Sequence, residues 1–227
     1  DLSAGLFAAQ GIMLALYERQ SSGKGQWVKT SLLQSQIFML DFQAARYAMN
    51  REIPGQAGNN HPTSIPTGVF KTKDGYINIA ASGEAIWQKL AKTLGHDEWI
   101  SDPLYKTALA RSKNRNQLGK KIDECTIHRT TSFWVNLLNE QGVPCGPIYS
   151  IDEMFSDPQV SYLNISQPVI NTDLEEIPVM TQPVSLSRTP SSLFKAAPKI
   201  GEDTNKILAE LGYKKKDILY LRKKKYI

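Results

Sequence analysis

The sequence predicts a mixed fold of the α/β or α+β class, on three observations. Stretches with apolar residues at helical spacing alternate with short segments rich in β-branched and aromatic residues. Between TGVFK and YINIA, the pair Asp74-Gly75 is typical of the two-residue turn of a β-hairpin. The chain has 227 residues, 41% hydrophobic and 22% charged, which is enough to bury a core and ordinary for a soluble globular protein.

The first predicted element is a helix over residues 4–18, apolar nearly all round and rich in alanine and glycine. A helix of this kind is expected to be buried and to pack closely against another backbone. It ends at Glu18 and Arg19, ahead of the glycine-rich turn SSGKGQ. A short strand, WVKTS, and a second helical stretch, LLQSQIFMLDFQAARYAM, follow.

A polar loop, Gly58–Pro62, precedes the hairpin and shows no periodicity that would bury it. Taken alone, Asn59 and Asn60 favour a turn with positive φ, which asparagine tolerates. After the hairpin, helices are expected at about residues 84–94 and in the stretches ARSKNRNQLGKKIDECTI and TSFWVNLLNEQG.

The remaining elements follow from caps, prolines and charge. Arg111, Asn114 and Arg115 are expected on a solvated helix face. The stretch SIDE matches a capping box that opens a short helix. Residues 164–190 contain four prolines, which favours edge strands and extended connections. EDTNKILAELGY then predicts a capped helix, followed by a short basic helix at the end of the chain.

The charge distribution and the cysteines exclude several function classes. Residues 214–225 carry seven Lys or Arg and one Asp, so the net charge of +5 leaves −1 for the rest of the chain. A solvated helix end explains this tail, and no stacking aromatics or binding motif indicate a nucleic-acid partner. No apolar run is long enough to span a membrane, and no signal peptide is evident. Cys125 and Cys145 show no metal-ligand spacing, so we expect a cytoplasmic protein, or a mitochondrial-matrix protein in a eukaryote.

Six stretches carry a family resemblance when taken in order: DLSAG, GIMLALYERQSSGKGQWVKTSLLQSQ, GNNHPTSIPTGVFKTKDGYINIA, ARSKNRNQL, LNEQGVPCGPIYSIDEMFSDPQV and PKIGEDTNKILAELGY. They resemble the family III CoA-transferases, the CaiB–BaiF family that includes formyl-CoA transferase, over essentially the whole chain. Several of the motifs are loose individually, whereas their ordered succession is specific.

The resemblance implies an α/β fold: part of a Rossmann-type large domain plus a small α+β domain, assembled as an interlocked homodimer. Residues 1–55 would be the C-terminal part of the large CoA-binding domain, residues 56–160 the small domain, and residues 161–227 a return segment to the large domain. The CoA-binding residues are expected mostly upstream of this chain. Because the chain begins with Asp1 rather than Met, we expect it to be a portion of a longer protein that is inactive alone.

The resemblance assigns the family's catalytic aspartate, which precedes the small-residue helix, to Asp1. An aspartate ahead of a helix is by itself more often a cap or a dipole partner. The family match on both sides of the position favours a nucleophile instead. The implied mechanism passes through an acyl-aspartyl anhydride and an aspartyl-CoA thioester. Coenzyme A is then a co-substrate, and no metal or redox cofactor is expected.

Such intermediates hydrolyse when water reaches them, so the site needs a cover. In formyl-CoA transferase a glycine-rich loop has this role, and Gly58, Asn59, Asn60 and His61 match its place. Of the glycines in that loop, only the one at position 58 is present in this chain. We therefore expect a stiffer loop whose Asn amides or His61 contact substrate. For His61 alone, a cap or surface hydrogen bond is an equal alternative.

Two other functions remain open. An α-methylacyl-CoA racemase of the same family would use the aspartate as an acid/base group with an upstream histidine, although the GNNHP stretch favours the transferase branch. The chain could also be a catalytically inert fragment or an assembly module held by its basic tail. The sequence does not reveal the donor or acceptor acid; relatives suggest a dicarboxylic donor such as succinyl-CoA.

Overall fold

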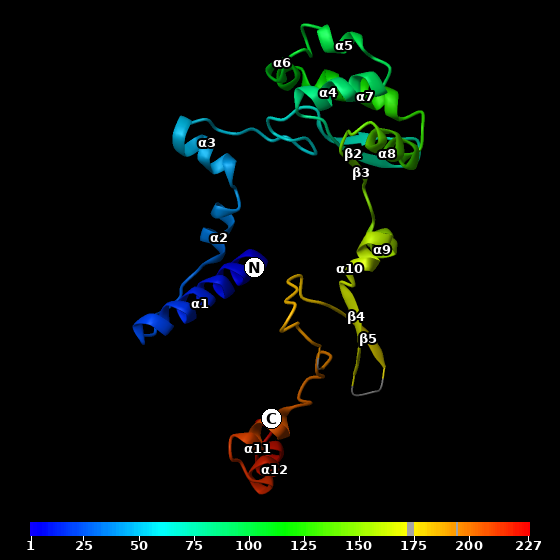
Figure 1. Ribbon diagram of the computed structural model, residues 1–227. Coiled ribbons are helices and arrows are strands. Elements are labelled where there is room, and N and C mark those ends of the chain that lie inside the picture. Colours follow the sequence, from blue (N-terminus) through cyan, green and yellow to red (C-terminus); the bar gives the residue numbers. More distant parts are fainter. Residues whose placement is uncertain (172–174, 194) are drawn as a thin grey trace. The chain divides into compact units, whose positions relative to one another are not determined.

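The computed structural model describes residues 1–171, 175–193 and 195–227 (Figure 1). Within these ranges the chain forms two compact units, Asp1–Ile148 and Tyr149–Ile227. The predicted mixed α/β class is confirmed, because helices combine with two small antiparallel sheets. No helix of the described part has both the length and the apolar character that a membrane crossing needs.

The helices are α1 (Leu2–Ser22), α2 (Leu32–Phe38), α3 (Phe42–Asn50), α4 (Glu84–Thr93), α5 (Glu98–Ser101), α6 (Ala108–Lys113), α7 (Arg115–Thr126), α8 (Thr131–Glu140), α9 (Ile151–Ser156), α10 (Pro158–Leu163), α11 (Thr204–Glu210) and α12 (Lys215–Lys223). The strands are β1 (Thr67–Lys71), β2 (Tyr76–Ala80), β3 (Cys145–Pro147), β4 (Ser166–Ile170) and β5 (Glu176–Met180). The predicted domain boundaries after residues 55 and 160 stay predictions, and the predicted return segment contains positions 172–174 and 194, which lie outside the described residues.

Helix α1 is longer than predicted and ends at Ser22. The next residue, Gly23, caps it with a left-handed φ of 69° and donates its N–H to the Arg19 carbonyl at 2.8 Å. The predicted strand WVKTS is wrong, because these residues form no ladder within the described chain. They run along α1 instead. A Cβ at Gly11 would lie only 2.8 Å from Val28 Cγ1, so this glycine permits the close approach.

The predicted burial of α1 is also wrong for the chain as described. Ala4 is the buried residue of this helix, whereas Leu6 and Met13 are each 64% exposed. Helix α2 packs on one side of α1, where the rings of Phe7 and Phe38 meet edge to face with centroids 5.1 Å apart. An all-round apolar helix offers more faces than this one neighbour covers, so a broad apolar surface remains open.

The stretch predicted as one helix after WVKTS forms two, α2 and α3. Ser31 caps α2 by accepting the Gln34 N–H at 3.1 Å. Asp41 has a positive φ of 49°, which breaks the helical path between Phe38 and Phe42. The apolar residues keep helical spacing through the break at Asp41, so the sequence pattern alone does not show where the helix is interrupted.

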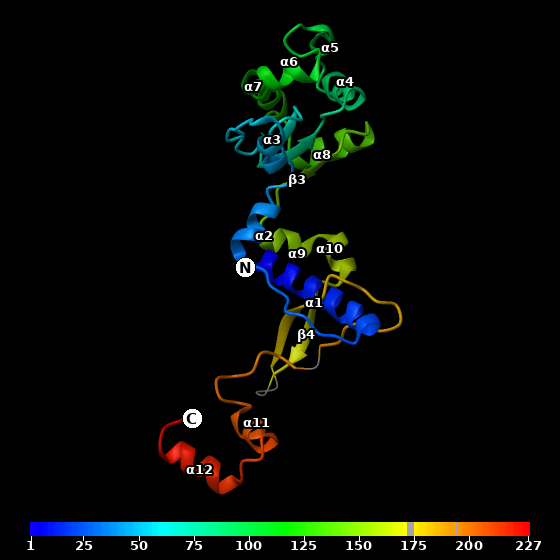
Figure 2. The same ribbon diagram turned by 90° about the vertical axis from the view of Figure 1, so that its left-hand side faces the viewer.

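The first sheet is antiparallel, in the order β1-β2-β3. The predicted hairpin is confirmed, but the predicted two-residue Asp74-Gly75 turn is wrong: Lys71 pairs with Tyr76, so residues 72–75 connect the strands, and neither Asp74 nor Gly75 has a positive φ. Alternation buries Phe70, Ile77 and Ile79 on one face of the sheet. Helix α7 packs on β1, and α8 packs on β2 and β3. Both views show helices α4 to α8 grouped with this sheet (Figure 1, Figure 2).

The hairpin turn has a second function beyond reversing the chain. Asp74 Oδ1 accepts the Thr131 N–H at 2.7 Å and the Thr131 hydroxyl at 3.0 Å, which ties the turn to the start of α8. The hydrogen bond from the Thr131 backbone N–H is the main reason that the pKa of Asp74 is lowered from its ordinary value. The ionised form of Asp74 therefore stabilises the folded state.

We expect Asp74→Asn to lower the melting temperature by a few degrees near neutral pH, because the charge-assisted bonds to Thr131 are weakened. A carboxyl whose folded-state pKa is depressed stabilises above its unfolded-state pKa and loses this contribution as the pH falls through the folded-state value. The difference from the wild type should therefore shrink below about pH 4. Thermal unfolding from neutral to acidic pH, with exposed Asp97→Asn as control, checks this. A difference that persists at acidic pH contradicts it.

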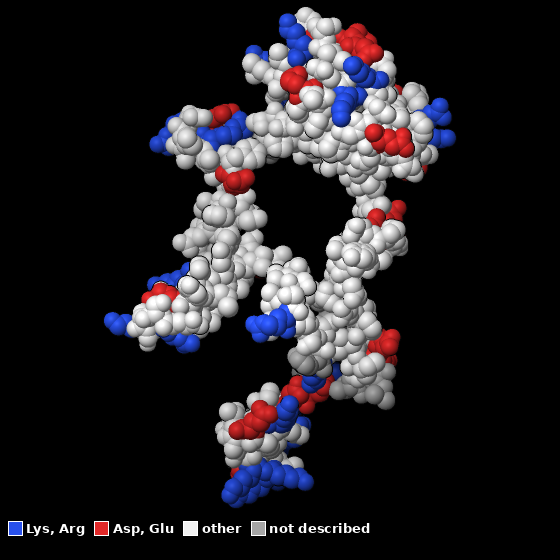
Figure 3. Space-filling view, in the orientation of Figure 1, with Lys and Arg blue, Asp and Glu red and all other residues white. Residues whose placement is uncertain are grey.

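The second unit confirms several local predictions, although Asp203 at the start of α11 does not form the predicted side-chain cap. The capping box forms at Ser150 and Glu153 and opens α9. Strands β4 and β5 pair antiparallel, with Pro168 opposite Pro178, as suits a two-stranded sheet with two edges. Basic side chains gather over α12 (Figure 3), at the exposed ranges 214–216 and 222–225. This tail is solvated as predicted.

Candidate active site

Asp1 occupies the N-cap position of α1, and its carbonyl accepts the Gly5 N–H at 2.9 Å. The residue is exposed, and its side chain makes no capping hydrogen bond within the described chain. The side-chain cap that an aspartate at this position commonly provides is therefore not formed. The carboxyl group lies at the positive end of a 21-residue helix, where a negative charge is favoured.

The loop Gly58–Pro62 is built as a turn that joins the start of β1. Gly58 has a φ of +56°, and the Asn60 N–H donates to the Ala57 carbonyl at 3.1 Å. Asn60 then forms a β-bridge with Gly68. The positive φ expected at Asn59 and Asn60 is wrong: among the loop residues, Gly58 alone has it. The glycine supplies the left-handed conformation, so the asparagines are not needed for it.

His61 is held by hydrogen bonds to one ring nitrogen and by stacking of its ring. Its Nδ1 accepts the backbone N–H groups of Ser64 at 2.9 Å and Thr63 at 3.2 Å. The ring stacks on Phe42, with centroids 5.7 Å apart and planes 9° apart. Because Nδ1 acts as an acceptor, the neutral ring carries its proton on Nε2. The predicted local hydrogen bond exists, and the Nε2–H is the donor that remains for a substrate contact.

Gly68 leaves room for the loop. A Cβ at this position would lie 2.5 Å from Asn60 Oδ1 and 3.0 Å from the Asn59 carbonyl oxygen. The second contact is to backbone, which cannot rotate away. The loop can therefore lie against β1 only because residue 68 has no side chain.

We expect Gly68→Ala to displace Asn59 and Asn60. If the loop covers the site that the family resemblance implies, the activity of the full-length protein should fall about tenfold, because a misplaced site residue costs reaction rate. The melting temperature should fall by only a few degrees, since the loop lies outside the buried core. Gly55→Ala is the matched control, because a Cβ there meets no atom within 4 Å. Equal activity of both variants would show that the approach to β1 is unimportant.

Arg111 corrects a prediction. It was expected on a solvated face, but it is completely buried. Its Nε donates to the Ile65 carbonyl at 2.9 Å, and Nη1 donates to the Tyr105 carbonyl at 3.0 Å. Nη2 pairs with the half-exposed Glu84 at 2.8 Å. The guanidinium satisfies backbone acceptors inside the core of the first unit, which is why its burial is tolerated.

Asn114 and Arg115 are also engaged rather than solvated. Asn114 Nδ2 donates to the carbonyls of Leu104 and Ala110, at 3.1 and 3.0 Å. Arg115 Nη2 donates to the Pro62 carbonyl, the last residue of the loop, at 2.6 Å. No local signal revealed these contacts. The stretch predicted as one helix divides at Asn114 into α6 and α7, so helical spacing from Leu118 and Ile122 does not extend to Arg111.

Other groups do not form a competing centre. Burial raises the pKa of the Cys125 and Cys145 thiols, which disfavours the thiolate that a cysteine nucleophile needs. Among the described residues, no three or more His, Cys, Asp or Glu side chains gather to hold a metal ion. Within the same ranges, no hydrogen bond joins Asp1 to the loop.

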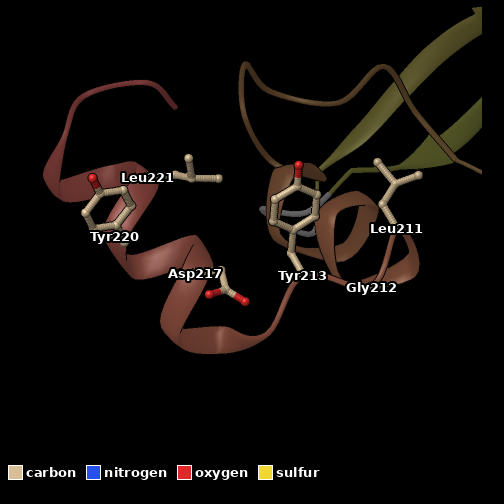
Figure 4. Close-up of a pocket in the computed structure, with 6 residues that line it drawn as sticks. All are labelled: Leu211, Gly212, Tyr213, Asp217, Tyr220 and Leu221. Atoms are coloured by element: carbon tan, nitrogen blue, oxygen red, sulfur yellow. The ribbon is translucent and has the colours of Figure 1, made fainter.

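Two of the surface hollows in the described structure lie away from the predicted residues. One, of about 510 Å³, lies between α1 and α2 and is lined by residues that include Phe7, Gln34 and Phe38. The other, of about 360 Å³, lies at the α11–α12 corner, where Tyr213, Asp217 and Tyr220 border it (Figure 4). Neither hollow contains Asp1 or a residue of the Gly58–Pro62 loop, so neither is the predicted site.

Comparison with known proteins decides the family. The family model described as CoA-transferase family III matches residues 1–204. The chain belongs to CoA-transferase family III. The family resemblance predicted from the sequence is thereby confirmed, while the roles of Asp1 and the loop stay predictions.

Relatives of this family III chain are similar over part of their length. The chain is 33% identical to a mouse succinyl-CoA:glutarate CoA-transferase over 93% of its own length and 48% of the relative. It is 31% identical to a succinyl-CoA–D-citramalate CoA-transferase of Chloroflexus aurantiacus, over 100% of the chain and 57% of the relative. A crystal structure of a CAIB/BAIF family protein from Brucella suis matches with a TM-score of 0.76 and 30% identity, over 92% of this chain and 54% of that one. The family III chain therefore spans about half the length of the curated relatives that it matches.

Proposed function

We propose that this family III chain carries the catalytic aspartate and the covering loop of an enzyme that transfers CoA from an acyl-CoA thioester to a free carboxylic acid. The observation that carries the proposal is the position of Asp1. It lies within the family match, is exposed at the positive end of α1, and its side chain forms no capping hydrogen bond within the described chain. A carboxylate so placed is suited to act as a nucleophile.

The proposed transfer has four balanced steps. The Asp1 carboxylate attacks the thioester carbonyl; a C–O bond forms, the C–S bond breaks, and CoA thiolate leaves an acyl-aspartyl anhydride. The thiolate attacks the aspartyl carbonyl and releases the donor acid as its carboxylate. The acceptor carboxylate then attacks the aspartyl-CoA thioester and again releases the thiolate. Finally the thiolate attacks the acceptor's acyl carbonyl, which forms the new acyl-CoA and frees the Asp1 carboxylate.

In each of the four steps an anionic nucleophile displaces an anionic leaving group, so no proton is consumed overall. They therefore balance without a redox cofactor, and coenzyme A acts as a co-substrate. The loop Gly58–Pro62 would close over these intermediates and limit their hydrolysis. The Nε2–H of His61 would offer a hydrogen bond to a developing negative charge on oxygen.

The names of the relatives suggest the substrates. The mouse and Chloroflexus relatives are named for succinyl-CoA as donor and for glutarate or D-citramalate as acceptor. We therefore propose a dicarboxylic donor, with succinyl-CoA first, and a short dicarboxylic acceptor. We further propose that the full-length protein is an interlocked homodimer, in which the open apolar surface of α1 is covered.

The test is to incubate the full-length protein with succinyl-CoA and a panel of dicarboxylic acids in deuterated buffer. We expect a new acyl-CoA with each accepted acid and no deuterium at the α-carbon of the acyl group. A racemase would instead incorporate deuterium there without forming a new acyl-CoA. If neither signal appeared across an extended panel of acyl-CoAs, both chemistries would be refuted. The 227-residue chain alone is expected to be inactive in the same assay.

A further inference from the structure

The loop Gly58–Pro62 is attached to the rest of the chain in two different ways. The Asn60 bridge to Gly68 and the His61 N–H bond to the Thr67 carbonyl, at 2.8 Å, hold it to the start of the adjacent strand. These attachments are local and join the loop to β1, on which α7 packs. The stack of His61 on Phe42 adds a contact to α3, but none of these contacts joins the end of the loop at Pro62 directly to a helix.

Arg115 attaches the loop from a distant helix. Its Nη2 donates to the Pro62 carbonyl at 2.6 Å, across 53 positions of sequence. The guanidinium is itself held, because Nε donates to the Ser112 carbonyl at 3.1 Å and Nη2 donates to the Ser112 hydroxyl at 3.0 Å. A hydrogen bond from a charged donor is shorter and stronger than a neutral one. Arg115 therefore connects α7 rigidly to the end of the loop.

Comparison with the neighbouring Arg111 indicates that Arg115 can be substituted without disrupting the core. Arg111 binds the Ile65 carbonyl, three residues beyond Pro62, but it is completely buried and also supports Tyr105. Its loss would damage the whole domain. Arg115 is only partly buried and bonds to Pro62 and Ser112, so its loss should affect the loop without unfolding its surroundings.

We propose that Arg115 is a positioning residue that holds the Gly58–Pro62 loop closed over the acyl-aspartyl intermediates, and so decides whether they transfer CoA or react with water. The proposal rests on the proposed function. When the loop opens, a water oxygen attacks the anhydride or thioester carbonyl, the C–O or C–S bond breaks, and free acid or free CoA leaves. The water's protons go to solvent and to the leaving group, and the Asp1 carboxylate is restored.

The test compares Arg115→Met, Arg115→Lys and the control Lys113→Met in the full-length protein. Lys113 is exposed and lies two positions away, so its variant removes a charge of the same sign without touching the loop. With succinyl-CoA, the ratio of hydrolysis to transfer should rise about tenfold in Arg115→Met, the shift expected from losing one charge-assisted hydrogen bond. Arg115→Lys should recover part of this change, and Lys113→Met should match the wild type. An unchanged ratio in Arg115→Met would overturn the proposal, even if its overall rate fell.

Hydrogen–deuterium exchange separates this proposal from the proposed function. Amide exchange in residues 55–64 should be faster in Arg115→Met than in the wild type, while exchange in β2 stays the same. This readout does not depend on activity. Unchanged exchange in residues 55–64 would overturn the role of Arg115, whether or not the wild type transfers CoA. Faster exchange with no transfer by the wild type would instead count against the proposed function alone.

Discussion

Asp1→Asn should reduce CoA transfer by the full-length protein by at least about 10⁴-fold, because an amide cannot form the anhydride on which every later step of the proposed transfer depends. The melting temperature should not change, since Asp1 is exposed and its side chain makes no capping bond in the described structure. Steady-state transfer from succinyl-CoA, measured beside thermal unfolding, checks both expectations.

Asp41→Asn is the matched control for this variant. Asp41 also precedes a helix, α3, and its side chain makes no capping hydrogen bond in the described structure. Its change therefore tests whether loss of any carboxylate at a helix start lowers the rate. If Asp1→Asn retained a tenth or more of wild-type activity, the nucleophile would have to be another group. An equal loss in Asp41→Asn would point to a structural effect.

Arg111→Met should lower the free energy of unfolding by about 3 kcal/mol, because it leaves the Ile65 and Tyr105 carbonyls without their donor inside the core. The Arg111 guanidinium also lies 5.2 Å from the Trp87 ring, and the shorter side chain loses this contact. Glu84 is 54% exposed, so its charge can return to water when Arg111 is lost. The predicted cost therefore comes from the carbonyls rather than from the ion pair.

Glu84→Gln separates these two contributions. It keeps Arg111 and its bonds to the two carbonyls, and it removes only the charge of a half-exposed partner. Its cost should be below about 1 kcal/mol. Chemical denaturation of both variants gives the comparison. If Glu84→Gln were as damaging as Arg111→Met, the ion pair would be the main contribution and the carbonyl argument would be wrong.

Local signals predicted the parts of the fold that depend on neighbouring residues. The β-hairpin around Asp74 and the capping box at Ser150 and Glu153 appear where the sequence indicates them, although the hairpin connection is longer than the predicted two residues. Both depend on residues two or three positions apart, so sequence alone contains the whole interaction. The strand predicted for WVKTS failed for the opposite reason: a strand needs a partner in space, and these residues run along α1 at Gly11 instead.

Only part of the candidate site could be predicted from the sequence. The family resemblance indicated Asp1 and the Gly58–Pro62 loop, and the glycine at position 58 agrees with its positive φ. The supports of the loop come from residues far along the chain, which no local pattern links to it. Arg115 reaches Pro62 across 53 positions, and charge alone suggested a solvated arginine. The burial of its neighbour Arg111 was likewise not predicted, because the helix is interrupted at Asn114.

The most direct test of the central claim is to trap the covalent intermediate on Asp1. The full-length protein is incubated with succinyl-CoA, quenched with hydroxylamine, and digested for peptide mass analysis. Hydroxylamine attacks an anhydride or thioester at the aspartyl carbonyl, so we predict a hydroxamate on the peptide that contains Asp1 and none in Asp1→Asn. A hydroxamate on a different acidic residue, or none at Asp1 while CoA transfer proceeds at full rate, would contradict the assignment of Asp1 as the nucleophile.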